Sequence, residues 1–237
     1  MSYAMDYRVV EHAPASARVA FIQRTYGHLA GAILAFIALE TALLKIEGVS
    51  EKVLETLFRG GMGWVVILFA FLGASYVARW WASSQTSRVM QYMGLGLYVV
   101  VQAIIFLPLL YIAQHFANDP NLIPKCGVMT LAIFGGLTIA VLTTRRDFSY
   151  LGPVLSLAVF LMLGFAIAGW LFGFNMPLVY SFAGVALASG FILYDTSNVI
   201  HHYRTDQHVA AALELFASVA LLFWYILRIA LATSSRD

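Results

Sequence analysis

Charged residues are scarce in this chain, and their scarcity decides its broad class. Asp, Glu, Lys and Arg make up 11% of its 237 residues, whereas soluble domains average about 25%. A soluble globular protein is therefore excluded, and the mean hydropathy of +0.82 indicates an integral membrane protein. The formal net charge is only +2, which excludes the strongly basic surface of a nucleic-acid-binding protein.

Cysteine and the short motifs of common enzyme classes are also lacking. Cys126 is the single cysteine, so the chain has no internal disulfide. Neither G-x-S-x-G, nor H-E-x-x-H, nor a phosphate-binding loop of the G-x-x-x-x-G-K-[ST] type occurs. The histidines of the segment 201–208, HHYRTDQH, do not follow the spacing of a zinc site, and this segment is predicted to be a polar loop. We therefore predict that the protein is not an enzyme, and we expect no catalytic residue, no metal site and no bound cofactor.

Seven long apolar runs are the dominant feature that the sequence does contain. The hydrocarbon core of a bilayer is about 30 Å thick and needs a helix of about 20 apolar residues. Seven stretches have about this length: residues 26–44, 64–81, 92–113, 126–143, 151–172, 178–200 and 209–231. We predict an all-α integral membrane protein with a seven-helix transmembrane bundle over residues 26–232. A cytoplasmic tail of residues 1–25 precedes it, and a short C-terminal tail of residues 233–237 follows.

The basic residues indicate the orientation of these spans. With the N-terminus in the cytoplasm, the inner segments contain more Arg and Lys than the outer ones, and Arg145 and Arg146 lie together in one inner loop. Basic residues collect on the cytoplasmic side of membrane proteins. We therefore expect a cytoplasmic N-terminus and a C-terminus on the outer side.

Glycines recur along the apolar runs. Small residues in membrane helices allow two backbones to approach closely. We therefore predict tight helix packing at Gly31, Gly73, Gly94, Gly96, Gly135, Gly136, Gly164, Gly169, Gly184 and Gly190.

Three acidic residues lie inside the predicted spans. A carboxylate at the centre of a membrane helix costs about 2.5–3.5 kcal/mol on insertion scales, so such a residue is a candidate functional site. Asp195 lies in FILYDTSNVI (191–200), near the end of the sixth span, and Glu214 lies near the start of the seventh. Glu40 is close to the end of the first span and is followed by Lys45, so we predict that its carboxylate extends to the membrane interface.

Asp195 and Glu214 are predicted to lie at similar depth in the membrane. Each is five residues from the end of its span next to the connecting loop, or about 7 Å along a helix. Asn198 and His202 follow Asp195 at helical spacing, and Ser218 follows Glu214 by four residues. These five side chains are therefore expected to form one polar cluster.

Two interpretations of this cluster remain open. In the first, the two acids titrate as a pair and act as a pH-linked gate, because ionised carboxylates repel each other or recruit a cation such as Ca²⁺. In the second, Asp195 bonds to a serine, an asparagine or an arginine and holds helices together. The nearest arginines, Arg79 and Arg228, lie close to the ends of their predicted helices.

Four segments of the chain resemble a known family of membrane proteins. TTRRDFSYLG (143–152) resembles the TTK-R-DFS-LG signature of the Bax inhibitor family, the transmembrane proteins with a Bax-inhibitor motif, and FILYDTSNVI resembles the motif of its sixth helix. FIQRTYGHLAGAIL (21–34) and AALELFASVALLFWYILRI (211–229) resemble its first and last helices. The resemblance covers nearly the whole chain and implies a seven-helix fold in which six helices wrap a central one. It assigns Arg145, Arg146, Asp147 and Phe148 to the family motif.

The resemblance also shows where this chain departs from many members of the family. Those members carry two aspartates, one on the sixth helix and one on the last, which form a pH-responsive latch over a calcium-leak pore. Asp195 matches the first aspartate, but Ser218 stands at the position of the second. The bacterial YccA-like branch is similar to this chain at that serine, in the acid-T-S-N run of the sixth helix and in a C-terminal S-R-D.

The YccA-like branch is associated with the membrane-anchored AAA protease of the FtsH type. The resemblance therefore implies a protein of the bacterial inner membrane that is a substrate and modulator of such a protease. The expected partners are the lipid bilayer, the protease and its associated membrane proteins. The alternative is a pH-sensitive calcium or cation leak channel gated around Asp195, with Glu214 replacing the missing aspartate and Ca²⁺ as the transported ion.

Overall fold

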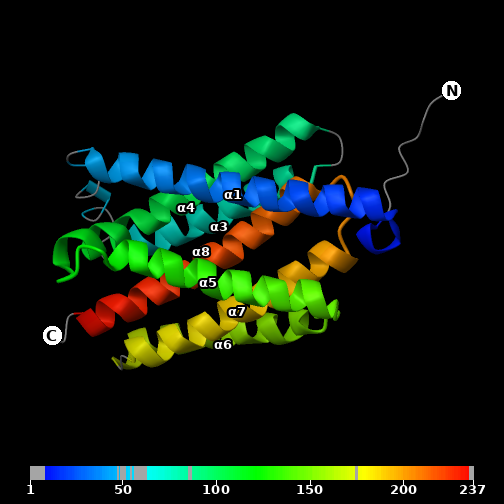
Figure 1. The fold of residues 1–237 in the computed structure, drawn as a ribbon. Coiled ribbons are helices and arrows are strands. Elements are labelled where there is room, and N and C mark those ends of the chain that lie inside the picture. The colour runs from blue at the N-terminus through cyan, green and yellow to red at the C-terminus, as the bar shows by residue number, and fades with distance from the viewer. Residues whose placement is uncertain are drawn as a thin grey trace. The chain divides into compact units, whose positions relative to one another are not determined.

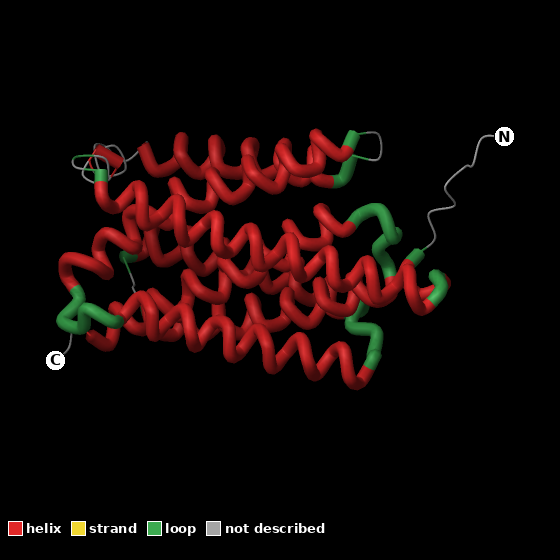
Figure 2. The backbone as a smooth tube through the Cα atoms, turned by 45° about the horizontal axis from the view of Figure 1, so that its top comes forward, coloured by secondary structure: helices red, strands yellow, loops and turns green. Residues whose placement is uncertain are grey.

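The computed structural model of the chain is built almost wholly of helices. It describes residues 9–46, 63–84, 87–173 and 176–234, together with residues 48, 52, 53 and 55. In these ranges a short 3-10 helix, η1 (Val10–His12), precedes seven α-helices. They are α1 (Ala15–Lys45), α3 (Gly63–Ala82), α4 (Arg88–Phe116), α5 (Leu122–Thr144), α6 (Leu151–Phe172), α7 (Pro177–His201) and α8 (His208–Ser234) (Figure 1). The all-α fold predicted from the apolar runs is confirmed, and Figure 2 shows how short the described loops are.

The helices cover the predicted membrane spans. Six of the described helices, α1 and α4 to α8, are long and apolar enough to cross a membrane. α3 covers the remaining predicted span, residues 64–81. The protein is therefore a multi-pass membrane protein.

The first helix begins much earlier than its predicted span. α1 starts at Ala15, directly after Pro14, and buries Phe21 and Thr25 on the face that continues into the span. Val10 is fully buried, and its N–H donates a hydrogen bond to the carbonyl of Tyr203 at 2.9 Å. The segment predicted as an N-terminal tail, residues 1–25, therefore contains helical structure from residue 10 onward. Gln23 and Arg24 of this stretch are exposed, whereas Phe21 and Thr25 are buried, so one face of the helix is already packed.

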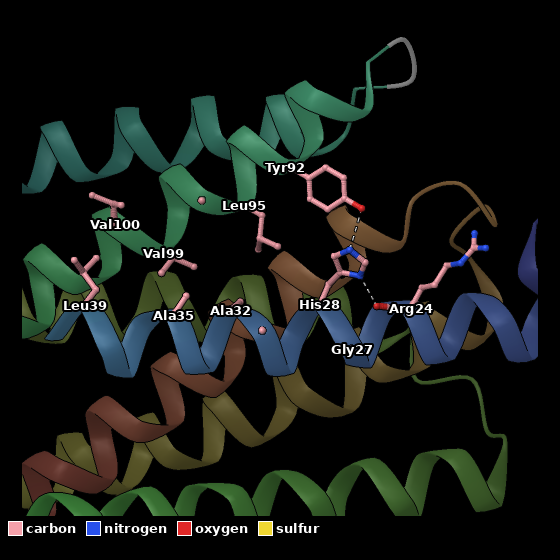
Figure 3. Close-up of a pocket in the computed structure, with 12 residues that line it drawn as sticks. Arg24, Gly27, His28, Ala32, Ala35, Leu39, Tyr92, Leu95, Val99 and Val100 are labelled. Carbon is pink, nitrogen blue, oxygen red and sulfur yellow. Dashed lines mark hydrogen bonds between the residues drawn. The ribbon is translucent and has the colours of Figure 1, made fainter. Parts of the chain in front are cut away.

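One compact unit of the chain comprises residues 1–115 and 203–216, here called the first unit. Phe36 of α1 packs edge-on against Phe106 of α4 and Phe216 of α8, with ring centroids 5.2 and 6.0 Å apart. Gly94 of α4 lies directly against the backbone of α3, because a Cβ atom placed there would be 2.5 Å from the carbonyl oxygen of Ala78. Elsewhere α1 and α4 leave a groove of about 620 Å³ between them (Figure 3).

The second unit comprises residues 116–202 and 217–237, so α8 contributes its first nine residues to one unit and the rest to the other. α5 and α6 both pack against α7. α7 packs against α8 at Gly184, where a Cβ atom would lie 2.4 Å from the ring of Tyr225. It packs against α6 at Gly190, where a Cβ atom would lie 2.6 Å from the Leu155 side chain.

The glycines thus fall into two groups. The predicted close packing is confirmed at Gly94, Gly184 and Gly190, where an added Cβ atom would collide with a neighbouring helix. It is wrong for a second group, in which an added Cβ atom would meet no atom of the described residues within 4 Å: Gly31, Gly73, Gly96, Gly135, Gly136 and Gly164. Glycine content alone therefore does not locate the helix contacts of this protein.

Candidate functional site

Asp195 is held by a serine in the second unit. Its carboxylate lies on α7 with the residue 7% exposed, and Ser218 of α8 is 5% exposed. The Ser218 hydroxyl donates a hydrogen bond to Oδ2 of Asp195 at 2.5 Å. A hydroxyl bonded to a carboxylate is among the strong hydrogen bonds of proteins, and removing one partner of a buried bond leaves the other unsatisfied. The contact agrees with the interpretation in which Asp195 holds two helices together.

Glu214 has a different partner, in the first unit. Its carboxylate forms an ion pair with the guanidinium of Arg79, which lies in the last turn of α3. The guanidinium also lies over the ring of Tyr98, 5.7 Å from its centroid, and Gln102 donates a hydrogen bond to the Tyr98 hydroxyl at 3.2 Å. The result is a chain of polar contacts from α8 through α3 to α4. Arg79 could not be assigned to this cluster from the sequence because it lies at the end of a predicted span, but Glu214 lies within reach of that end.

The predicted five-residue cluster therefore divides between separate partners. Ser218 bonds to Asp195, whereas Glu214 pairs with Arg79. His202 does not belong with Asp195 as predicted: its Nε2 lies 3.9 Å from Oδ2 of Asp147. The backbone carbonyl of Asn198 accepts a hydrogen bond from the N–H of His202 at 2.9 Å, so Asn198 belongs to the last turn of α7.

Glu40 is buried, which contradicts the prediction that it extends to the interface. The residue is 4% exposed and shares one face of α1 with Ala32 and Phe36. Neither of its carboxylate oxygens has a hydrogen-bond partner within the described part of the chain. An ionised carboxylate would be costly in such surroundings. The spacing of four residues between Ala32, Phe36 and Glu40 was the sequence signal for this burial.

The family-motif segment begins where α5 ends. Arg145 takes the left-handed conformation, with φ of 50°, and its N–H bonds to the carbonyl of Val141 at 2.8 Å. Few residues other than glycine adopt this conformation, and here it turns the chain out of the helix. Arg146 follows as an exposed residue.

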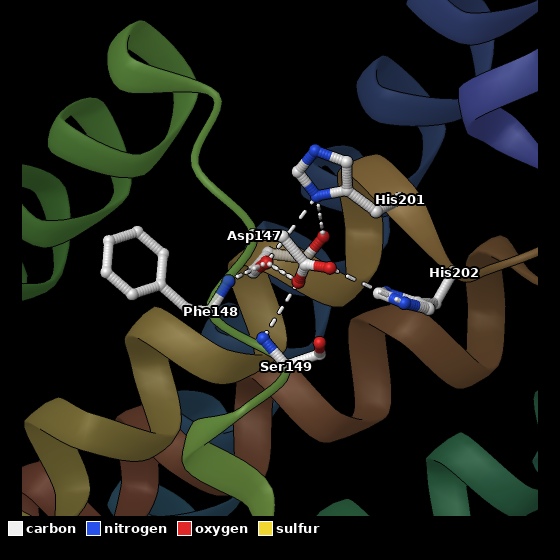
Figure 4. Close-up of polar contacts among 6 residues, drawn as sticks. Asp147, Phe148, Ser149, His201 and His202 are labelled. Carbon is white, nitrogen blue, oxygen red and sulfur yellow. Dashed lines mark hydrogen bonds and ion pairs between the residues drawn. The ribbon is translucent and has the colours of Figure 1, made fainter.

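Asp147 then organises the loop. Its Oδ1 accepts the backbone N–H of Ser149 at 2.8 Å (Figure 4). This N–H holds the pKa of the Asp147 carboxyl below its usual value, and the nearby His202 and Ser197 lower the pKa further. Asp147 is therefore a carboxylate at neutral pH, at the centre of a set of hydrogen-bond donors.

Ser197 connects this loop to α7. Its hydroxyl donates to Oδ1 of Asp147 at 3.2 Å and accepts the backbone N–H of Phe148 at 2.8 Å. Ser197 is fully buried. The family motif thus fixes the loop between α5 and α6 to the end of the helix that carries Asp195. Ser197 was not among the predicted site residues, and its sequence signal was its place in the same D-T-S-N run as Asp195.

Comparison with known proteins gives one family match and several relatives. The family described as "Inhibitor of apoptosis-promoting Bax1" matches residues 18–236. An uncharacterised protein of Pseudomonas aeruginosa is 28% identical over 170 residues, which are 69% of this chain and 72% of that protein. Protein LIFEGUARD 4 of Arabidopsis thaliana is 25% identical over 217 residues, or 90% of this chain and 84% of the relative.

A shorter match is more similar. Protein lifeguard 4 of Mus musculus is 34% identical over 117 residues, which are 46% of this chain and 47% of the mouse protein. In that match the chain spans about half the length of its relative. The family match, in contrast, extends from the first turns of α1 to the end of α8. The chain therefore belongs to the Bax inhibitor family.

Proposed function

We propose that this protein is a regulatory protein of the bacterial inner membrane, both a substrate and a modulator of a membrane-anchored AAA protease of the FtsH type. The observation that carries the proposal is the hydrogen bond from Ser218 to Asp195. In the calcium-leak members that the chain resembles, a second aspartate stands at the position of Ser218. Here the position supplies a hydroxyl, which bonds to a carboxylate without repelling it.

Glu214 is a weak replacement for the missing aspartate. Its carboxylate is already paired with Arg79, so its partner is a guanidinium and not a second acid. A pH-linked acid pair consists instead of two carboxylates that share a proton. The contacts of both acids therefore favour a protein whose helices are held together over one that opens on deprotonation. In this role it has no catalytic residue of its own and acts through binding, with its N-terminus in the cytoplasm.

The first test is the turnover of the protein in cells. Residues 2–8 are the segment to remove, because Val10 is buried against residue 203 and α1 begins at Ala15. We expect the deletion to lengthen the half-life to the value measured in cells that lack the protease, because residues 2–8 are the proposed segment that the protease grasps. Pulse-chase labelling measures the half-life, and affinity capture from membranes measures the association with the protease.

A matched control replaces residues 2–8 by a Gly/Ser segment of equal length. This control keeps the length of the N-terminal segment and changes its sequence. It therefore shows whether the protease requires the length or the sequence of that segment. An unchanged half-life after deletion, or equal half-lives with and without the protease, contradicts the proposal.

The cation leak is the second candidate, and the burial of Asp195 is the observation in its favour. A carboxyl group inside a span is costly to retain and is found where ions or protons pass. Calcium flux into proteoliposomes, measured against pH for the parent and for Asp195→Asn, tests this role. With Ser218 in place we expect no flux that depends on Asp195. Asp119→Asn is the control, because Asp119 lies in the exposed loop before α5 and pairs with Lys125. A pH-dependent flux that Asp195→Asn abolishes and Asp119→Asn preserves would show the leak.

A further inference from the structure

The groove between α1 and α4 of the first unit is unusual because glycines form part of its walls. α1 contributes Gly27 and Gly31, and α4 contributes Gly96. A Cβ atom at any of the three would meet no atom within 4 Å. These glycines therefore do not bring the helices together. They leave an open trough of about 620 Å³, within the range of ligand-binding pockets.

The floor and the far end of the trough are apolar. Ala35 and Leu39 of α1 face Val99 and Val100 of α4 across it (Figure 3). The lining extends from Arg24 to Leu39 along α1, which is about 22 Å at the rise of a helix. Half of a bilayer core is only about 15 Å thick, so the trough is long enough to take an extended hydrocarbon chain.

The near end of the trough is polar and basic. His28 points from α1 towards Tyr92 of α4 (Figure 3), with Nε2 3.1 Å from the tyrosine hydroxyl and Nδ1 2.6 Å from the carbonyl of Arg24. The Arg24 side chain is exposed at this end. His208, whose ring centroid is 5.0 Å from that of His28, lies within electrostatic range of Arg24 and Arg88.

One acid at this end, Asp206, is already engaged by a cation. Asp206 also acts on His208, but its Oδ1 lies 3.2 Å from Nε of Arg204. The remaining charge at the mouth of the trough is therefore that of the arginines. A guanidinium presents donors that match the oxygens of a phosphate group, and basic residues at the cytoplasmic end of a span attract anionic lipid headgroups.

We propose that this groove binds one anionic phospholipid taken from the bilayer. An acyl chain lies along the trough over Gly27, Gly31 and Gly96, and the phosphate group contacts Arg24 and the hydroxyl of Tyr92. The charge of the arginines selects the headgroup, and the missing side chains of the glycines make room for the chain. The inference concerns the surface of α1 and α4 and does not depend on the proposed role in proteolysis.

The test compares lipid binding by the full-length purified protein. Phosphatidylglycerol and phosphatidylcholine with identical chains are added to delipidated protein in detergent, and bound lipid is counted by native mass spectrometry. We expect phosphatidylglycerol to bind in a one-to-one ratio. Phosphatidylcholine should bind at least about tenfold more weakly, because its cationic choline group offsets the phosphate charge and is repelled by the arginines. Arg24→Gln is expected to remove this preference and Arg24→Lys to retain part of it.

The variant Gly31→Leu/Gly96→Leu tests the trough itself. Its two side chains enter space that is empty in the structure, so the protein should fold and fail to bind the lipid. Gly135→Leu/Gly164→Leu is the matched control, because these glycines also face open space but belong to α5 and α6. Equal binding of both lipids by the parent, or unchanged binding by the trough variant, overturns the proposal. So does a trough variant that changes the oligomeric state, because the occupant is then a second copy of the chain.

Discussion

Replacement of Arg79 by glutamine is expected to destabilise the protein by about 2 kcal/mol. The substitution leaves the Glu214 carboxylate without its cation. Such a loss costs about 3–5 kcal/mol for a buried pair and 1 kcal/mol or less for an exposed one. The side chains of Arg79 and Glu214 are 44% and 27% exposed, so this pair lies between the two limits. Thermal unfolding of the purified protein in one detergent measures the effect.

The reciprocal substitution, Glu214→Gln, is expected to destabilise the protein less than Arg79→Gln does. In Glu214→Gln the guanidinium of Arg79 still lies over the Tyr98 ring, where a cation–π contact contributes about 0.5–2 kcal/mol. The double variant should therefore be more stable than Arg79→Gln alone, and a double-mutant cycle should give a coupling energy of the opposite sign to the single losses. Lys125→Gln, which breaks the exposed pair with Asp119, is the control and should leave the unfolding temperature unchanged. Strictly additive effects at residues 79 and 214 would show that the pair makes no net contribution.

The positions of the helices could be predicted from the sequence because the length of an apolar run is set by the bilayer. The fifth span was predicted as residues 151–172, and α6 occupies Leu151–Phe172. The start of α1 could not be found in this way, since residues 15–25 contain polar side chains and lie before the apolar run. Their helical structure depends on packing of one face, which hydropathy averaged over a window does not detect.

The partners of the acids could not be predicted for a different reason. Distance from the end of a span gives the depth of a residue, and Asp195 and Glu214 have similar predicted depths. The choice of partner depends on the rotation of each helix about its axis. That rotation is fixed by contacts such as Gly184 against the Tyr225 ring, which join residues far apart in the sequence. Ser218, one helical turn beyond Glu214, is the residue that α8 presents to Asp195.

Addition of one methyl group at Gly94 is expected to be as harmful as removal of a charge. A Cβ atom there would lie 2.5 Å from the carbonyl oxygen of Ala78 and 2.5 Å from the backbone nitrogen of Ala82. Backbone atoms cannot move aside by a change of rotamer, so α3 and α4 must separate. Overpacking of this kind typically costs about 1–3 kcal/mol and occasionally more, and we expect Gly94→Ala to reach the upper part of that range in thermal unfolding.

Gly96→Ala provides a close control, two residues further along the same helix. A Cβ atom at Gly96 would meet nothing within 4 Å, and alanine is about 1 kcal/mol better than glycine inside a helix. The two alanine variants should therefore shift the unfolding temperature in opposite directions. Equal shifts would mean that α3 and α4 are not in contact at Gly94.

The Gly94 contact should also control the Arg79–Glu214 pair. Arg79 follows Ala78 directly, so the turn of α3 that Gly94→Ala displaces is the turn that presents the guanidinium to Glu214. Once that turn has moved, the ion pair is already weakened. Arg79→Gln should therefore destabilise the protein less in the Gly94→Ala background than in the parent. A cost that is the same in both backgrounds would show that the ion pair forms independently of the α3–α4 contact. Close packing at one glycine would then stabilise the helices without positioning the charges.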